Sequence, residues 1–187
     1  MVVKHAIRHK YLAIREKLSS DFAKKCSVVI AERVLAIASV RSAKRICAYL
    51  PINNEVDTRK IIDDLLLRNQ QVFLPKYFKY RDEYGLAHFK DWKTLEAGPH
   101  QILEPAGSLE IDPDEIEVAI LPGLAFDSEG VRLGYGKGIF DKLLGGSRAF
   151  KIGLAYDFQI VEKLPREKHD LVMDLVVTEK RIIKVGS

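Results

Sequence analysis

The spacing of apolar residues changes several times along the chain, and each change predicts a new element. Over residues 4–18 apolar side chains recur three and four positions apart, which predicts an amphipathic helix whose opposite face is basic. Residues 19–21 then offer N-caps for a second amphipathic helix. The expected buried stripes are Ile7, Tyr11, Ile14 and Leu18 in the first helix, and Phe22, Val29, Ile30, Val34, Leu35 and Ile37 in the second.

Short apolar runs between turn residues predict the strands. They cover residues 46–50, 71–75, 118–121, 151–155 and 175–177. Strands that lack polar alternation are typical of a parallel sheet that is covered on both faces. We therefore expect a three-layer, Rossmann-like α/β fold, in which helices flank both faces of a mostly parallel sheet.

Two further helices are expected between these strands. One covers residues 61–66, with Asp57 or Thr58 as its cap, and the other covers residues 138–144 and ends at a pair of glycines. The pattern is weaker over residues 76–113, where we expect one strand over residues 86–89 and otherwise loops.

Length and composition narrow the class of protein. With 187 residues, 47% of them hydrophobic, the chain suits one substantial core, so we expect residues 1–187 to form a single domain. No stretch has transmembrane length or the pattern of a secretory signal, which predicts a cytoplasmic protein without a membrane partner. Cys26 and Cys47 lack the spacing of a metal site or a disulfide framework. The formal charge of +4 suits a polyanionic small molecule as well as nucleic acid, and no nucleic-acid motif accompanies it.

The strongest local signal is the glycine-rich segment over residues 132–141. Its three alternating glycines lack the Cβ atoms that would keep backbone N–H groups away from phosphate oxygens. Arg132 and Lys137 add positive charge, and Asp141 offers a ligand for Mg²⁺. Because ligands bind at the carboxyl ends of parallel strands, the position of this segment after a predicted strand also favours a binding site.

Known nucleotide motifs do not describe this segment. A Walker A loop needs Ser or Thr after its lysine, and here Gly138 follows Lys137. A dinucleotide fingerprint needs a third glycine where Ile139 stands. A flexible surface turn is the alternative to a phosphate-binding loop.

These residues, together with the run over residues 121–127, resemble the 5-formyltetrahydrofolate cyclo-ligase family, also called methenyltetrahydrofolate synthetases. Lys4 and Arg8 stand where that family has a Lys-x-x-x-Arg start, and residues 55–58 resemble its Glu-x-x-Thr segment. Residues 102–105 resemble its Gly-Ile-x-Glu-Pro segment, with Gln101 in place of the glycine, and residues 169–179 match its tail. The family usually has two aromatic residues before Asp141, and this chain has Ile139 and Phe140, which removes one aromatic contact and one hydroxyl.

The resemblance implies an ATP-dependent ligase that converts 5-formyltetrahydrofolate to 5,10-methenyltetrahydrofolate with release of ADP and phosphate. The formyl oxygen would be phosphorylated, and N10 would then attack the activated carbon. The same resemblance implies catalytic roles for Arg132 and Lys137, and Mg²⁺ as a cofactor at Asp141 and Asp170. It also implies a fold similar to those of sugar isomerases and CoA transferases.

The residues expected at the two substrates follow from the same resemblance. The ATP contacts would be Lys4, Arg8, Arg132, Leu133, Gly134, Tyr135, Gly136, Lys137, Gly138, Ile139 and Phe140. The folate contacts would be Leu50, Glu55, Trp92, Tyr135, Gly136, Lys137, Gly138 and Ile139. Trp92 is equally well interpreted as a packing aromatic. His169 beside Asp170 could form a general base pair, although a structural or magnesium-positioning role is favoured.

Two other functions remain open at this point. An α/β enzyme that acts on a phosphosugar or a CoA thioester would use a similar fold, and a nucleotide-binding module without turnover would use a similar loop. As partners we expect only the two small molecules, 5-formyltetrahydrofolate and ATP, with neither nucleic acid nor a membrane. The protein itself would be a monomer or a weak homodimer.

Overall fold

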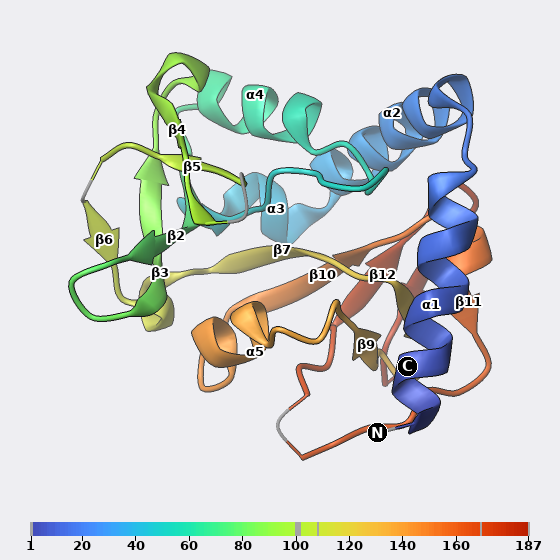
Figure 1. Ribbon diagram of the computed structural model, residues 1–187. Coiled ribbons are helices and arrows are strands. Elements are labelled where there is room, and N and C mark those ends of the chain that lie inside the picture. Colours follow the sequence, from blue (N-terminus) through green and yellow to red (C-terminus); the bar gives the residue numbers. More distant parts are fainter. Residues whose placement is uncertain (1, 100–101, 108, 169, 187) are drawn as a thin grey trace.

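A mixed sheet of eight strands runs through the middle of the molecule (Figure 1). The computed structural model describes residues 2–99, 102–107, 109–168 and 170–186. Across the sheet the strand order is β13-β12-β10-β7-β1-β2-β3-β6. The strands are β1 (Arg45–Cys47), β2 (Gln71–Phe78), β3 (Glu83–Phe89), β6 (Glu110–Ile111), β7 (Val118–Pro122), β10 (Phe150–Leu154), β12 (Leu175–Val177) and β13 (Ile182–Lys184).

The five inner strands, from β12 to β2, are parallel, and β13, β3 and β6 are antiparallel additions at the two edges. All residues of β7, at the centre, are buried. Such a strand is apolar throughout because helices or loops cover both of its faces. The prediction of a mostly parallel sheet is therefore confirmed.

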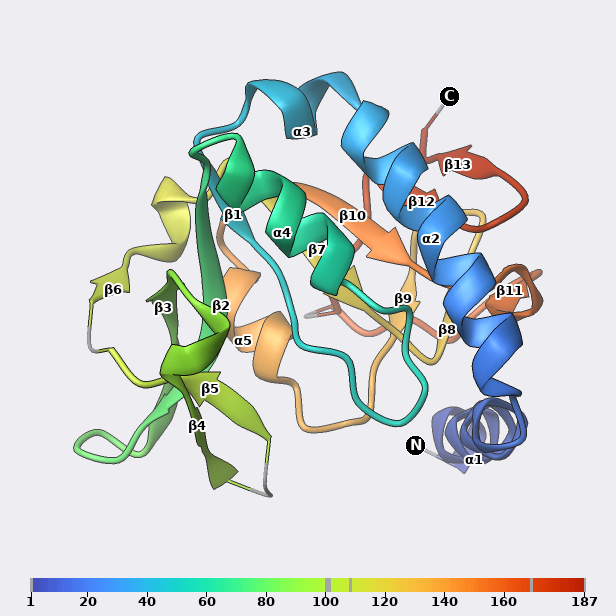
Figure 2. The same cartoon turned by 90° about the horizontal axis from the view of Figure 1, so that it is seen from above.

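Helices form the outer layers unequally (Figures 1 and 2). The helices are α1 (Val2–Glu16), α2 (Ser20–Ala36), α3 (Ala38–Ser42), α4 (Arg59–Leu67) and α5 (Ile139–Leu144). One face of the sheet packs against α2, α3 and α4 around a large apolar core. The other face carries the short α5 and a small sheet of β11 (Ile160–Val161), β8 (Ala125–Asp127) and β9 (Arg132–Leu133). This arrangement confirms the predicted α/β class, although the second face has a single short helix.

The first helix begins and ends near the predicted bounds, but it buries a different face. Lys4 is 7% exposed, Tyr11 6% and Arg15 1%, whereas Ile14, expected in the buried stripe, is 37% exposed. The predicted buried stripe is therefore confirmed at Tyr11 and wrong at Ile14, and two cations share the buried face with it. Burial of these cations is tolerated because each finds acceptors from distant segments.

The start of the second helix is confirmed, and its buried stripe only in part. The backbone N–H of Phe22 donates to Ser19 Oγ at 3.2 Å, which caps α2. Ile30 and Val34 are fully buried, but Phe22 is 39% exposed and Val29 37%. The buried stripe is displaced around the helix, because Cys26, Ser27 and Ala31 are buried in place of Phe22 and Val29.

The two residues expected to cap α4, Asp57 and Thr58, lie at its start and make different contacts. Thr58 stands at the N-cap position, but its hydroxyl donates to the carbonyl of Tyr49 at 2.5 Å and makes no cap hydrogen bond. Asp57 Oδ1 accepts from the backbone N–H of Arg59 at 2.9 Å. Thr58 therefore ties the start of α4 to the chain that leaves β1.

Several short elements lie where only loops were expected. The segment after β7 forms β8 and β9, and residues 95–111 form the hairpin β4 (Leu95–Ala97) and β5 (Leu103–Pro105) followed by β6. Strands of two or three residues leave no periodic pattern to recognise. The single domain over residues 1–187 stays a prediction, supported by a sheet whose strands come from both halves of the chain. Within the described residues, no helix has the length and apolar character needed to cross a membrane.

Candidate active site

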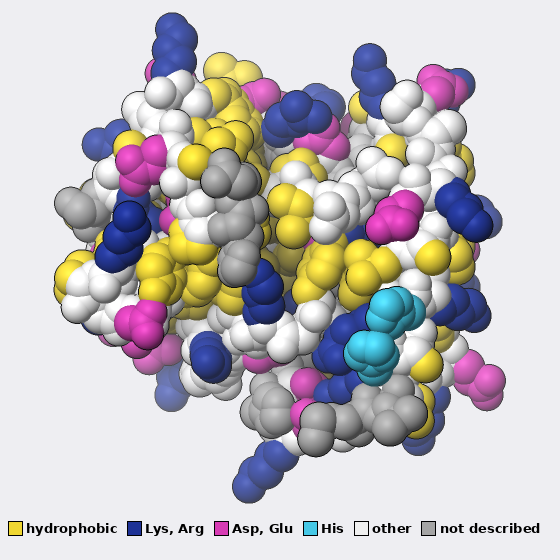
Figure 3. Space-filling model, viewed as in Figure 1, with side chains coloured by type: hydrophobic (Ala, Val, Ile, Leu, Met, Phe, Trp, Pro, Cys, Tyr) yellow, Lys and Arg dark blue, Asp and Glu magenta, His cyan; other side chains and the backbone are white. Residues whose placement is uncertain are grey.

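A cavity of about 590 Å³ lies beside the carboxyl ends of β1 and β7 and the middle of β2. On the face shown in Figure 3, apolar side chains gather around a central hollow, and basic side chains lie beside it. The walls come from α1, from the loop after β1, from the middle of β2 with β5, and from the glycine-rich segment. The position agrees with the rule that parallel sheets bind ligands at their strand ends.

Nearly every residue predicted for the site lines this one cavity. These residues are Lys4, Arg8, Leu50, Glu55, Arg132, Leu133, Gly134, Tyr135, Gly136, Lys137, Gly138, Ile139, Phe140, Asp141 and Asp170. They come from four segments that are far apart in sequence. Their convergence supports the roles expected of them, which stay proposals.

Trp92 is the exception. It does not line the cavity, its indole N–H donates to Asp63 at 2.6 Å, and its ring packs edge-on against Phe89 at a centroid distance of 5.0 Å. Its contacts are those of a packing aromatic between β3 and α4, so we leave Trp92 out of the proposed folate site. His169 lies outside the described residues.

The glycines of the loop allow arginine side chains to pack on the backbone. Gly136 has φ 99° and Gly138 φ 64°, both in the left-handed region that favours glycine. A Cβ on Gly136 would lie 3.3 Å from Cζ of Arg8, whose Nε donates to the carbonyl of Gly134 at 2.9 Å. The loop therefore holds Arg8 of α1 against its own backbone.

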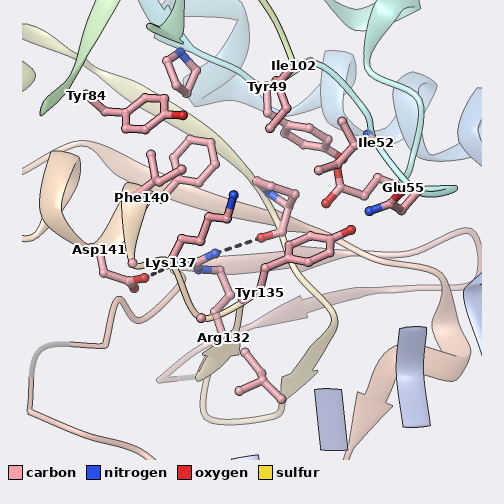
Figure 4. A pocket seen from close by; sticks show the side chains of 18 of the residues that line it. Tyr49, Ile52, Glu55, Tyr84, Ile102, Arg132, Tyr135, Lys137, Phe140 and Asp141 are labelled. Carbon is pink, nitrogen blue, oxygen red and sulfur yellow. Dashed lines mark hydrogen bonds and ion pairs between the residues drawn. The ribbon is translucent and has the colours of Figure 1, made fainter. Parts of the chain in front are cut away.

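Arg132 is the buried cation of the loop, and it joins the loop to β7 and α5 (Figure 4). Its guanidinium is in an ion pair with Asp141 at 2.8 Å and donates to the carbonyl of Pro122 at 3.1 Å. The other oxygen of Asp141 accepts from the backbone N–H of Leu171 at 3.2 Å. These contacts fix both side chains at the edge of the cavity without a ligand.

Lys4 is held in a comparable way by the segment before β12. Its Nζ lies 2.6 Å from Asp170 Oδ2 and 3.4 Å from Glu167 Oε2. This pair connects the first helix to residues near the other end of the chain. Both members line the cavity, so a cation and a carboxylate lie side by side there.

Lys137 differs from these cations because it is exposed and points into the cavity (Figure 4). Among the described residues it has no ion-pair partner. A hydrated ammonium at the mouth of a cavity is available to a phosphate ligand, since no internal contact has to break.

Glu55 is a buried carboxylate on another wall, in the loop after β1. Its Oε2 accepts from the backbone N–H of Ile52 at 3.0 Å, and its Oε1 lies 3.8 Å from Arg15 Nη1. Burial raises the pKa of the Glu55 carboxyl to about 7, and Arg15 and the Ile52 N–H oppose this rise. The carboxyl can therefore change its charge near neutral pH.

Sequence reasoning missed Arg15, which organises this wall. Its guanidinium donates to the carbonyls of Asn53 at 3.0 Å and Gly123 at 3.2 Å, and also to the hydroxyl of Tyr135. A signal was present in the chain, because Lys4, Arg8, Tyr11 and Arg15 follow one another at spacings of four, three and four. That spacing places them on one face of a helix.

The residues fit a magnesium ion that is held jointly with a ligand. The described residues contain no group of three or more His, Cys, Asp or Glu side chains that could hold a metal on their own. Mg²⁺, however, is commonly bound by one or two carboxylates together with substrate phosphates. Asp141 and Asp170 both line the cavity, so they offer two carboxylates beside the cations.

Comparison with known proteins identifies the family. The sequence model of the 5-formyltetrahydrofolate cyclo-ligase family matches residues 1–179. The 5-formyltetrahydrofolate cyclo-ligase of Saccharomyces cerevisiae is 30% identical over 204 residues, with 95% of each chain covered.

Solved structures agree. The 5,10-methenyltetrahydrofolate synthetase of Aquifex aeolicus is 32% identical, with a TM-score of 0.89 over 99% of this chain and 94% of that one. The 5,10-methenyltetrahydrofolate synthetase of Mycoplasma pneumoniae is 24% identical, with a TM-score of 0.76, and the match covers 94% of this chain and 98% of that one. At this identity the likeness supports the fold.

Proposed function

Because the chain belongs to the 5-formyltetrahydrofolate cyclo-ligase family, we propose that it uses ATP to close 5-formyltetrahydrofolate into 5,10-methenyltetrahydrofolate. One observation carries the proposal: the cavity joins the cations Lys4, Arg8, Arg132 and Lys137 to a buried carboxylate, Glu55. The cations suit a triphosphate. The carboxylate suits a heterocycle with N–H donors, such as a pterin.

The chemistry explains why such a site needs no side-chain nucleophile. A formyl amide is a poor electrophile, so its oxygen is converted to a leaving group by accepting the γ-phosphoryl group of ATP. N10 then attacks the formyl carbon, the ring closes and phosphate departs. Phosphoryl transfer asks the protein mainly to position the reactants and to stabilise negative charge.

The cations of the cavity differ in how firmly other residues hold them, and we assign their roles from this difference. Arg132 is fixed by Asp141 and Pro122, and Arg8 by Gly134, so both present charge at set positions. Lys137 is exposed and without an ion-pair partner among the described residues, so it can follow the transferring group. We therefore assign Arg132 and Lys137 the catalytic roles and place Lys4 and Arg8 on the ATP phosphates.

The folate would lie against the wall that contains Leu50 and Glu55, with the loop residues Tyr135 to Ile139 beside it. Glu55 would accept hydrogen bonds from the pterin, and an ionised carboxylate accepts them more strongly than a protonated one. Because the pKa of Glu55 is about 7, binding of such donors would favour its ionised form. Holding N10 close to the activated carbon is worth about 7 to 11 kcal/mol in well-oriented reactions.

Asp141 and Asp170 would hold Mg²⁺ together with the phosphates, sharing their carboxylates with Arg132 and Lys4. The ion would neutralise part of the triphosphate charge. The cytoplasmic location, the monomeric or weakly dimeric state and the absence of nucleic-acid partners stay predictions.

An absorbance assay tests the function directly. The purified protein is mixed with 5-formyltetrahydrofolate and Mg-ATP, and formation of methenyltetrahydrofolate is followed in the near ultraviolet. We expect a gain in absorbance that needs ATP and is abolished by a chelator. No gain, with ATP binding intact, would favour the nucleotide-binding module, and turnover of a phosphosugar or CoA thioester instead would favour the other enzyme class.

A further inference from the structure

Glu104 is a second buried carboxylate in the cavity, and the proposed mechanism gives it no role. It lies in β5, within the segment over residues 102–105 that the sequence singled out. Its side chain lines the cavity together with Ile102, Leu103 and Tyr84, and the residue is only 3% exposed. A buried carboxylate is costly and calls for an explanation.

Within the part of the chain that the structure describes, only one oxygen of this carboxylate has a hydrogen-bond partner. Oε2 accepts from the backbone N–H of Tyr77 at 3.1 Å. Oε1 is buried and has no hydrogen-bond partner among the described residues. Burial also raises the pKa of the Glu104 carboxyl above its ordinary value, and the N–H of Tyr77 and the charge of Lys76 only partly oppose this rise.

The surroundings are shaped to hold the carboxyl group in place. Gly98 on the facing chain has no side chain, and a Cβ there would overlap the Glu104 carboxyl. Lys76, whose charge influences Glu104, uses its ammonium elsewhere: it contacts Glu96 Oε1 at 2.7 Å and the carbonyl of Pro105 at 2.5 Å. These contacts already attach the β4–β5 hairpin to β2, so the hairpin does not need the free oxygen of Glu104.

We propose that Glu104 Oε1 accepts a hydrogen bond from an N–H or O–H donor of a substrate bound in the cavity. The residue would be a specificity-determining contact that works alongside Glu55. A carboxylate only accepts hydrogen bonds, so its ligand is a donor and not an anion. The phosphates of ATP and the carboxylates of a glutamate tail are therefore excluded as its partners.

The proposed function, on which the choice of ligand rests, leaves two sources of such a donor. ATP offers the adenine amino group and the ribose hydroxyls, and the folate offers the N–H groups of its ring and linker. Glu55 on another wall already suits the pterin, and two acceptors in one cavity suit two substrates.

The experiment replaces Glu104 with glutamine. In Glu104→Gln the amide oxygen can still accept from Tyr77, while an NH₂ group takes the place of Oε1 and turns an acceptor into a donor. We expect the KM for one substrate to rise about tenfold to a hundredfold, the worth of a hydrogen bond to a charged group, with a smaller change in kcat. The melting temperature should stay within a few degrees.

Glu96→Gln is the matched control. Glu96 lies directly across from Glu104 in the β4–β5 pair, but its side chain is 54% exposed and it is absent from the cavity lining. Its substitution should leave both KM values unchanged. If Glu104→Gln does not fold, Glu104→Asp, which withdraws the carboxylate by one methylene, replaces it with the same expected rise.

Substrate analogues identify the donor. A rise in the KM for ATP assigns the donor to ATP. Among 2′-deoxy-ATP, 3′-deoxy-ATP and ITP, the analogue that lacks this donor should then bind the wild-type protein more weakly than ATP does. The same analogue should bind the variant as tightly as ATP does. A rise in the KM for 5-formyltetrahydrofolate alone assigns the contact to the folate. If both KM values stay within twofold of wild type, or rise equally, the proposal is overturned.

Calorimetry separates this proposal from the proposed function. ATP and 5-formyltetrahydrofolate are titrated singly into wild type and Glu104→Gln, which requires no turnover. Absence of turnover in the wild-type protein would overturn the ligase function, yet selective loss of affinity for one of these compounds in the variant would still support a ligand contact at Glu104.

Discussion

Two sides of the cavity differ in the exposure and pairing of their charged side chains. The loop side, residues 132–141 with Lys4 and Arg8, has an excess of cations, and Lys137 there is exposed. The Glu55 side, made of Arg15 and Glu55, is an internal cluster in which Arg15 is 1% exposed and Glu55 6%, and Arg15 also donates to the hydroxyl of Tyr135 in the loop.

The difference follows from the cost of burying charge. A charge intended for an anionic ligand can stay hydrated until the ligand arrives, whereas a charge inside the protein needs partners from the start. Substitution of an exposed cation on the loop side, such as Lys137, should therefore change activity and leave stability alone. Substitutions on the Glu55 side should change both.

The largest expected effect comes from removing the cation of the Glu55 side. Arg15→Met leaves Glu55 without its cation and the carbonyls of Asn53 and Gly123 without their donor. We expect the free energy of unfolding to fall by about 3 to 5 kcal/mol, measured by urea denaturation at pH 8. Lys10→Met, on the exposed side of α1, is the control and should change it by less than about 0.5 kcal/mol. A small loss for Arg15→Met would mean that the cluster does not stabilise the fold.

On the loop side the corresponding test is Lys137→Ala. We expect kcat to fall by about 10²- to 10³-fold, because a charge that stabilises the transferring group is lost, with no change in melting temperature. Lys142→Ala serves as the control, since Lys142 is exposed on the neighbouring helix and does not line the cavity. An unchanged rate and an unchanged affinity for ATP would remove Lys137 from the phosphate site.

The pH dependence of stability sharpens the comparison further. The pKa of Glu55 rises from 4.5 to about 7 on folding, so the folded state holds this proton more tightly. The resulting stabilisation is complete below pH 4.5 and is lost as pH rises through 7. Glu55→Gln does not titrate at this position and is the reference. Relative to it, the free energy of unfolding of the wild type should fall by up to about 3 kcal/mol as pH rises through 7, and should then stay constant. Urea denaturation at a series of pH values measures the difference, and a flat difference would contradict the assignment.

The smallest effect should be on ligand affinity. Glu55→Gln should weaken binding of 5-formyltetrahydrofolate by about tenfold to a hundredfold and leave ATP binding nearly unchanged, because one charged acceptor is lost on the folate wall alone. Calorimetry with each ligand separately provides the measurement. An equal loss for both ligands would argue that Glu55 supports the fold of the cavity and does not contact folate.

Much of the site could be predicted because its residues are close together in the chain or stand in recognisable patterns. The loop over residues 132–141 carries its glycines, its cations and Asp141 in one stretch. Lys4, Arg8 and Glu55 were found through family resemblance, and the structure brings them to the same cavity. Trp92, by contrast, packs against Phe89, and nothing in the spacing of the chain distinguished a packing aromatic from a stacking one.

The sequence by itself determined the parallel core of the fold, since apolar runs and amphipathic spacing record which surfaces must leave water. Only the tertiary structure decided that the cation Arg15 is buried, that the short strands β8 and β9 follow β7, and that Glu104 keeps one oxygen unpaired among the described residues. The physical reason is that a buried charge depends on acceptors supplied by distant segments, and no local pattern records them.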